Sequence, residues 1–198
     1  MTENNKKITF LCTALALTLP FPGRIAFGFV SILHFNVCVI LLTLILHAVK
    51  RLKLENIMIG ICSMELIALT IFYKQVLIIF CPVAALTAGY SIYLPAMASV
   101  SVIIENKIRA NSLKEDCLVK MKKSLGVSAF SFIIFVLRDI FGFSTITLPG
   151  WQNFFIVKLP VLIKNASFSS FLATLPGCLV LVVLAFFVYS KILEKKSA

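Results

Sequence analysis

The stretch ITFLCTALALTL, residues 8–19, is followed by PFPGR at residues 20–24. It is apolar enough to enter a bilayer, but a helix that crosses a membrane needs about 20 apolar residues. Pro20 and Pro22 stop a helix from continuing, because proline lacks the amide hydrogen and clashes with the preceding turn. The chain therefore begins with an expected half-helix, and this half-helix carries one thiol, Cys12.

The composition places this half-helix in an integral membrane protein. Hydrophobic residues make up 60% of the 198 residues and charged residues 14%, against about 25% charged residues in soluble domains. A water-soluble fold of this length could not hide that much apolar surface. The apolar runs have helix length and do not alternate with period two, which favours helices over a barrel. The prolines also replace the small residues of a cleavage site, so the first run is not a secretory signal.

The remaining apolar runs predict about six transmembrane helices in a single all-α membrane domain, residues 1–198. The runs are Ile25–Val49, Ile57–Tyr73, Val76–Tyr93 (interrupted by Pro82 and Gly89), Leu94–Ile104, Leu125–Phe143 and Phe171–Ile192. Between them we expect a basic loop at 106–123 and a mixed loop at 145–170.

Two short apolar pieces, Ile8–Leu19 and Leu94–Ile104, are each followed by a polar break and a full span. Interrupted segments at matching places in two halves of a chain are typical of inverted repeats with a site between them. We therefore predict two inverted pseudo-repeats, at about 1–75 and 90–192, and we expect the two short pieces to approach each other. The alternative is that both are ordinary short helices with ragged ends.

The net charge of +11 does not indicate a nucleic-acid partner, because Lys and Arg cluster in loops and termini. If each half-helix with its extended tail crosses the membrane, 14 of the 19 basic residues fall on one side; if both half-helices re-enter instead, the split is 13 to 6. The positive-inside rule makes that side cytoplasmic, so we expect a multi-pass protein with both termini in the cytoplasm. The basic loop 106–123 is expected to bind anionic membrane lipid or a partner's cytoplasmic face.

Three motifs resemble one membrane-protein family. The half-helix LCTALALT at 11–18 is similar to LCPxLAVT, and RDIFGFSTI at 138–146 is similar to RE(I/F)(L/F)GxGT(L/I). The stretch FLATLPG at 171–177 is similar to the start of the family's last helix. These motifs resemble the RnfE/NqrD-type membrane subunits of the Rnf and sodium-translocating NADH:quinone reductase complexes. The order along the chain agrees, apart from extra residues around Val76–Tyr90.

The resemblance implies a cofactor and partners. In that family two paralogous six-helix subunits of the bacterial inner membrane sit together with opposite topology. Each gives one cysteine from each half-helix to a shared iron–sulfur centre, and four thiolates are the usual ligands of a [2Fe–2S] cluster. Cys12 matches the first of these cysteines, but Ser101 stands where the second is expected. A neutral serine hydroxyl is a poor ligand beside thiolates, so either the ligation is unusual or the architecture is kept without a normal centre.

Glu65 is the candidate for an ion pathway. A carboxylate inside a membrane span is costly and by default indicates function, and in the family an acidic residue of the third helix is associated with cation passage. The alternative is a neutral Glu65 in an interhelical hydrogen bond. Arg138 and Asp139 are expected to form a structural ion pair at a helix end.

Together these features predict a non-catalytic subunit of a redox-driven translocase that relays electrons and couples them to cation transport. No residue pattern resembles a nucleotide or flavin site, so we assign no catalytic residues to the chain. The alternatives are a six-helix small-molecule transporter component, similar to the substrate-binding subunit of an energy-coupling-factor importer, and a structural membrane anchor. The six cysteines show no paired metal spacing such as CxxC and predict no disulfide framework.

Overall fold

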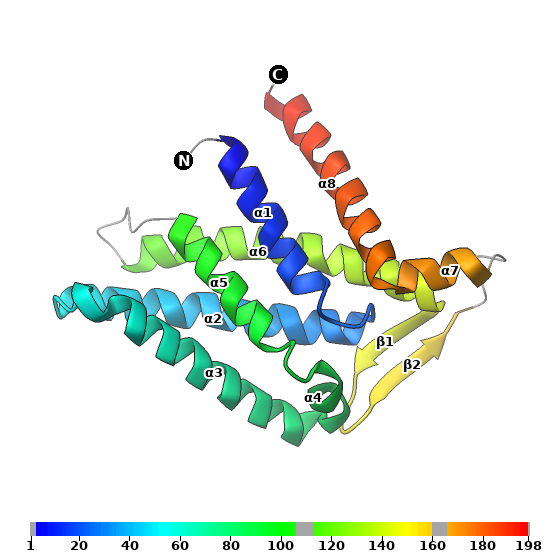
Figure 1. The fold of residues 1–198 in the computed structure, drawn as a ribbon, viewed down its shortest axis with the longest axis horizontal. Coiled ribbons are helices and arrows are strands. Elements are labelled where there is room, and N and C mark those ends of the chain that lie inside the picture. The colour runs from blue at the N-terminus through cyan, green and yellow to red at the C-terminus, as the bar shows by residue number, and fades with distance from the viewer. Residues whose placement is uncertain (1–2, 106–112, 160–165, 198) are drawn as a thin grey trace.

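The computed structural model describes residues 3–105, 113–159 and 166–197, and these are mostly helical (Figure 1). The elements in chain order are α1 (Glu3–Thr18), α2 (Ile25–Arg51), η1 (Glu55–Ile57), α3 (Met58–Phe80), α4 (Pro82–Ala88), α5 (Tyr93–Glu105), α6 (Leu113–Leu137), η2 (Arg138–Phe143), β1 (Thr145–Pro149), β2 (Phe154–Lys158), α7 (Ala166–Ala173) and α8 (Leu175–Ser197).

Within the described residues, three helices are long and apolar enough to cross a membrane: α2, α3 and the continuous α6–η2 segment, Leu113–Phe143. The bent pair α4–α5 becomes a fourth if it counts as one span. Two shorter apolar helices, Lys7–Thr18 and Leu175–Val188, accompany them. The structure therefore agrees with a helical membrane protein, with three to four candidate spans where the sequence predicts about six.

The antiparallel helices α2 and α6 form the centre of the molecule and share its most extensive helix contact (Figure 1). They approach closely where Gly28 of α2 lies against Phe135 of α6, because a Cβ atom at Gly28 would come within 2.7 Å of that ring. Helices α1 and α5 lie across this pair. By contrast, α3 is mostly exposed along its length, as expected for a helix that faces lipid or another subunit.

The two short apolar pieces do approach each other, as predicted. Helix α1 ends at Thr18, just before Pro20, and packs against α5. Helix α5 follows α4 after a bend of 72°, and Gly89 lies in this bend with a φ of 51°. Only glycine adopts such a backbone conformation without strain. The extra residues around 76–90 thus form the end of α3, the short helix α4 and the bend.

The structure corrects two expected loops. Part of the basic loop 106–123 is helical, because α6 begins at Leu113; the part at 106–112 lies outside the described residues. The mixed loop contains a β-hairpin instead, in which Thr145 pairs with Lys158 and Pro149 with Phe154. The reason is that TITLP and FFIVK are rich in β-branched and aromatic residues and flank a turn at Gly150. The last predicted span is divided at Thr174 into α7 and α8.

Candidate functional site

The junction of α1 and α5 is formed by two hydroxyl groups. Thr13 Oγ1 lies 2.7 Å from Ser101 Oγ. The Thr13 hydroxyl is also within 2.7 Å of the carbonyl of Thr9, and the Ser101 hydroxyl within 2.7 Å of the carbonyl of Ala98. Each hydroxyl has a single hydrogen, so one of them donates to its own helix and the other donates across the junction. The bond ties the two short helices together inside the fold.

Cys12 does not share this junction. Its side chain is exposed, whereas the neighbouring Thr13 is buried. Successive residues of an α-helix are turned by about 100° around its axis, so the residue after Cys12 is the one that meets Ser101. The structure brings the two predicted half-helices together, and it directs the predicted thiol ligand to the outer surface of α1.

Cys12 does not belong to a complete metal site within the described residues. No group of three or more His, Cys, Asp or Glu side chains that could hold a metal ion occurs in the described part of the chain. All six cysteines are free in this structure; Cys12 is exposed, whereas Cys38, Cys81 and Cys178 are buried. The Ser101 hydroxyl is engaged with Thr13. A [2Fe–2S] cluster bound here would need its other ligands from a second subunit.

Glu65 lies on α3 and is half-buried, with Oε2 shielded from solvent and without a hydrogen-bond partner among the described residues. Its neighbours include Cys62, one turn earlier, and Cys38 of α2. One carboxylate oxygen is therefore directed into the protein, and the interhelical hydrogen bond that is the alternative role of Glu65 is not formed within the described residues. Cys62 and Leu66, on either side of Glu65, line an apolar cavity of about 570 Å³ between α2, α3 and α5.

Arg138 donates hydrogen bonds to carbonyl groups at the C-terminal ends of two helices, α1 and α7. Its Nη1 donates to the carbonyls of Thr18 and Phe21 at 3.2 and 3.3 Å, and its Nη2 donates to the carbonyl of Ala173 at 3.1 Å. These carbonyls belong to the last residue of α1, the turn after it and the last residue of α7. The last carbonyls of a helix have no partner inside the helix, and the guanidinium supplies donors to them. A Cβ atom at Gly23 would lie 2.6 Å from Arg138 Nε, so the arginine needs a glycine beside it.

Asp139 holds the start of α2 and of the hairpin. Its Oδ2 accepts hydrogen bonds from the amides of Ile25 and Thr147, at 3.1 and 2.8 Å, and its Oδ1 accepts one from the hydroxyl of Thr145 at 2.7 Å. Both Arg138 and Asp139 are buried and lie in the π-helical turn η2, a feature that often occurs at functional sites. In the described part of the chain the predicted ion pair between them is absent, and each binds helix or strand ends instead.

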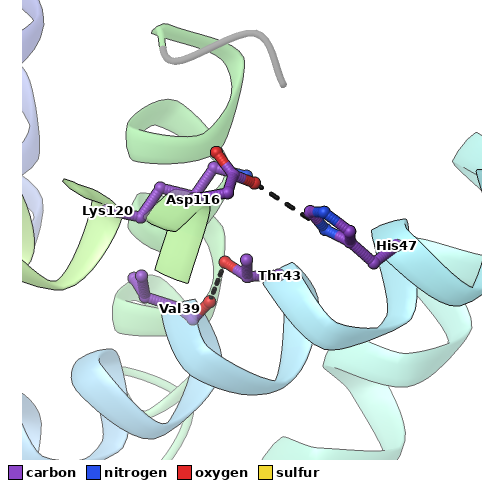
Figure 2. A network of polar contacts seen from close by, with 5 residues as sticks. All are labelled: Val39, Thr43, His47, Asp116 and Lys120. Atoms are coloured by element: carbon purple, nitrogen blue, oxygen red, sulfur yellow. Dashed lines mark hydrogen bonds and ion pairs between the residues drawn. The ribbon is translucent and has the colours of Figure 1, made fainter. Parts of the chain in front are cut away.

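A second buried charged cluster lies at the opposite end of the α2–α6 pair. Two of its residues, Asp116 and Lys120, fall in the segment 106–123, which the sequence analysis predicts to be a loop. Lys120 Nζ donates to Asp116 Oδ2 at 2.7 Å, and His47 Nδ1 lies 3.8 Å from the same oxygen. Figure 2 shows Asp116 and Lys120 on α6 facing His47 and Thr43 on α2. The side chain of Lys120 has no exposed area. The signal in the sequence was the four-residue spacing of Asp116, Lys120, Ser124 and Ser128, which puts them on one helix face.

Comparisons with known proteins leave the family of this chain open. No protein-family model matches it, and neither the curated proteins nor the solved structures give a match. The resemblance to RnfE/NqrD-type subunits therefore rests on the three motifs of the sequence.

Proposed function

We propose that this protein is a membrane subunit of a redox-driven, ion-translocating electron-transport complex of the Rnf or sodium-translocating quinone reductase type. The observation that carries the proposal is the contact between two short apolar helices, α1 and α5, through Thr13 and Ser101. The family resemblance associates such a pair of half-helices with its electron-relay site. In this proposal the chain sits in the bacterial inner membrane with both termini in the cytoplasm, and its six helices form two inverted repeats.

The partner in this proposal is a paralogous six-helix subunit, and Cys12 faces it. The exposure of Cys12 supports this role, because a ligand of a shared centre must be accessible to the second subunit. Thiolates are the usual protein ligands of iron–sulfur clusters. The chain would supply one thiolate, and Ser101 would position α5 through Thr13 or act as a weaker oxygen ligand.

Replacement of Cys12 by alanine tests the shared centre. In the complex purified with the paralogous subunit, we expect Cys12→Ala to lose the iron and the paramagnetic signal of the centre, because no other thiol of this chain replaces it. Cys117→Ala on α6 is the control and should keep both. Ser101→Ala and Thr13→Val together separate the two roles of Ser101, since both break the hydrogen bond at the junction but only Ser101→Ala removes the Ser101 hydroxyl. Loss of the signal in Ser101→Ala alone would make that hydroxyl a ligand. Equal iron in wild type and Cys12→Ala would leave Cys12 without a ligand role.

Replacement of Glu65 by glutamine tests the ion pathway. We expect redox-driven cation transport to fall at least about tenfold with assembly unchanged, because glutamine keeps the shape of the side chain but removes the charge that attracts a cation. The measurement is cation uptake into vesicles that contain the complex, beside the electron-transfer rate. Ser63→Ala, at an exposed position of the same helix, is the control. Unchanged transport in Glu65→Gln would limit Glu65 to a structural role.

The cavity beside α3 favours a second candidate function, the substrate-binding subunit of a small-molecule importer. Its volume of about 570 Å³ lies in the usual range for ligand pockets, about 300–1,000 Å³. The lining is mostly aliphatic, with residues such as Leu42, Leu66 and Val100, which would select an apolar substrate. Neighbouring genes separate the two functions: those of the first encode ferredoxin-like and flavin-linked subunits, and those of the second encode importer ATPases.

A further inference from the structure

Polar side chains run along the buried interface between α2 and α6, through a protein that is otherwise strongly apolar. On α6 they recur at about one per turn, which keeps them on one face of the helix. All five are buried: Asp116, Lys120, Ser124, Ser128 and Ser131. Because α2 runs antiparallel to α6, its own polar residues His47, Thr43 and Asn36 meet them in reverse order. We call these eight residues the polar seam.

The charged end of the seam is the cluster of Asp116, Lys120 and His47 (Figure 2). A buried ion pair adds little stability, because the desolvation of both charges offsets their attraction. Inside a membrane bundle such groups mark ion or proton pathways by default. His47 is partly exposed, at 19% of its side chain, so the cluster reaches the outside through an imidazole ring, whose two nitrogens can donate and accept hydrogen bonds.

The middle of the seam is a chain of hydrogen bonds that crosses between the two helices. The Ser124 hydroxyl donates to Asn36 Oδ1 at 2.9 Å, and Asn36 Nδ2 donates to the Ser128 hydroxyl at 2.9 Å. Ser131, three residues further, has no exposed area, and its hydroxyl has no hydrogen-bond partner among the described residues. A buried hydroxyl without a partner is costly, and this one lies where the chain of hydrogen bonds stops.

An aromatic ring separates this chain from the other charged groups. Phe135 is fully buried one turn after Ser131 and lies against Gly28 of α2. Beyond it are Arg138 and Asp139 with the hydroxyls of Thr145 and Thr147. At 1.5 Å per residue, Asp116 and Asp139 are about 35 Å apart along the helix, similar to the roughly 30 Å hydrocarbon core of a bilayer. The polar groups thus extend over a membrane thickness, with one apolar barrier.

We propose that the α2–α6 interface is a proton pathway that is gated by Phe135 and exchanges protons with water at the Asp116–Lys120–His47 cluster. The carried species is a proton and not a metal cation, because the Lys120 ammonium already neutralises Asp116 and repels other cations. Each step passes one proton from an O–H or N–H group to a lone pair on the next hydroxyl or water. The Asn36 amide has no basic lone pair on its nitrogen, so it orients the hydroxyls of Ser124 and Ser128 and does not itself carry the proton. Water at His47 returns the proton that Lys120 gives up, so charge and atoms balance. The pathway uses side chains of this chain alone and does not rest on the electron-transfer role.

The test measures proton flux through the purified full-length chain in liposomes that contain a pH-sensitive dye, driven by a potassium diffusion potential. Phe135→Ala should raise the flux at least about tenfold over wild type, because it removes the apolar constriction. Phe132→Ala is the matched control, since Phe132 lies on the same helix with an exposed side chain. Adding Lys120→Met to Phe135→Ala should return the flux to the wild-type value. Equal flux in the Phe135→Ala and Phe132→Ala liposomes, or flux that persists in the double variant, would overturn the proposal.

Two further measurements test the proposal: the sodium flux through Phe135→Ala, and infrared difference spectra of the wild type. Sodium flux through Phe135→Ala should stay at the wild-type level, and a sodium flux equal to the proton flux would overturn the assignment to protons. If Phe135→Ala does not fold, infrared difference spectra of the wild type across a pH jump replace it. They should contain a carboxyl band that Asp116→Asn removes. Spectra without an Asp116-dependent band would show that the cluster does not exchange protons, which also contradicts the proposal.

Discussion

Replacing Arg138 by leucine is expected to lower the free energy of unfolding by about 3–5 kcal/mol, because each buried hydrogen-bond acceptor that is left without a partner costs about 1–3 kcal/mol. The guanidinium is the donor for the carbonyls of Thr18, Phe21 and Ala173. Leucine fills similar space but leaves all three acceptors without that donor, in a region that water does not reach. Arg138→Lys should restore only part of the lost stability, because a single ammonium group cannot donate to both helix ends as the planar guanidinium does.

The chain contains its own reporters for this measurement. Cys38 and Cys178 have no exposed area, so their reaction with a thiol-reactive dye during heating in detergent follows unfolding. We expect the midpoint of Arg138→Leu to fall by about 6–20 °C, given the usual 2–4 °C per kcal/mol for a chain of this size. Arg24→Leu is the control, because Arg24 lies at the same end of α2 but stays partly exposed, over the ring of Phe143. Equal midpoints for the two variants would mean that Arg138 does not hold the ends of α1 and α7.

Replacing Gly28 by leucine should have the second largest effect, a loss of about 3 kcal/mol, at the upper end of the cost of overpacking a core. Even a Cβ atom at this position would come within 2.7 Å of Cγ and Cδ2 of Phe135. Phe135 is fully buried, so no free space beside the ring can accept an added leucine side chain, and α2 and α6 must separate. Their separation would also break the hydrogen bonds of Asn36 to Ser124 and Ser128.

Gly126→Leu on α6 is the matched control for this substitution. No atom lies within 4 Å of a Cβ added at Gly126, so leucine there adds apolar surface without a clash. The same thiol assay should give a midpoint for Gly126→Leu within a few degrees of wild type and a clearly lower one for Gly28→Leu. If Gly28→Leu and Gly126→Leu unfold at the same midpoint temperature, α2 and α6 do not approach each other closely at Phe135.

The long apolar helices could be predicted from the sequence alone. The runs that became α2, α3 and the second half of α6 were predicted from their length and composition. This works because a helix in a membrane satisfies its backbone hydrogen bonds within its own segment, so the information is local. The end of α1 before Pro20 and the bend near Gly89 could be predicted for the same reason, since proline and glycine affect the conformation of the adjacent backbone.

The rotation of α1 was decided by the tertiary structure. The helix is apolar around most of its circumference, so the sequence contains no stripe that distinguishes an inner from an outer face. Only the packing of α1 on α5 turned Thr13 inward and Cys12 outward. The start of α6 was missed for a related reason. Asp116 and Lys120 resemble loop residues until α2 covers them and places His47 beside them.

The roles of Arg138 and Asp139 also depended on the tertiary structure. Two adjacent opposite charges predict an ion pair, yet Arg138 binds a carbonyl 120 residues away and Asp139 binds an amide 114 residues away. Every peptide group in the chain offers the same donor and acceptor, so no sequence pattern identifies which of them an arginine will meet. The groups that need a partner are those at helix ends, and the fold alone decides which helix ends come together.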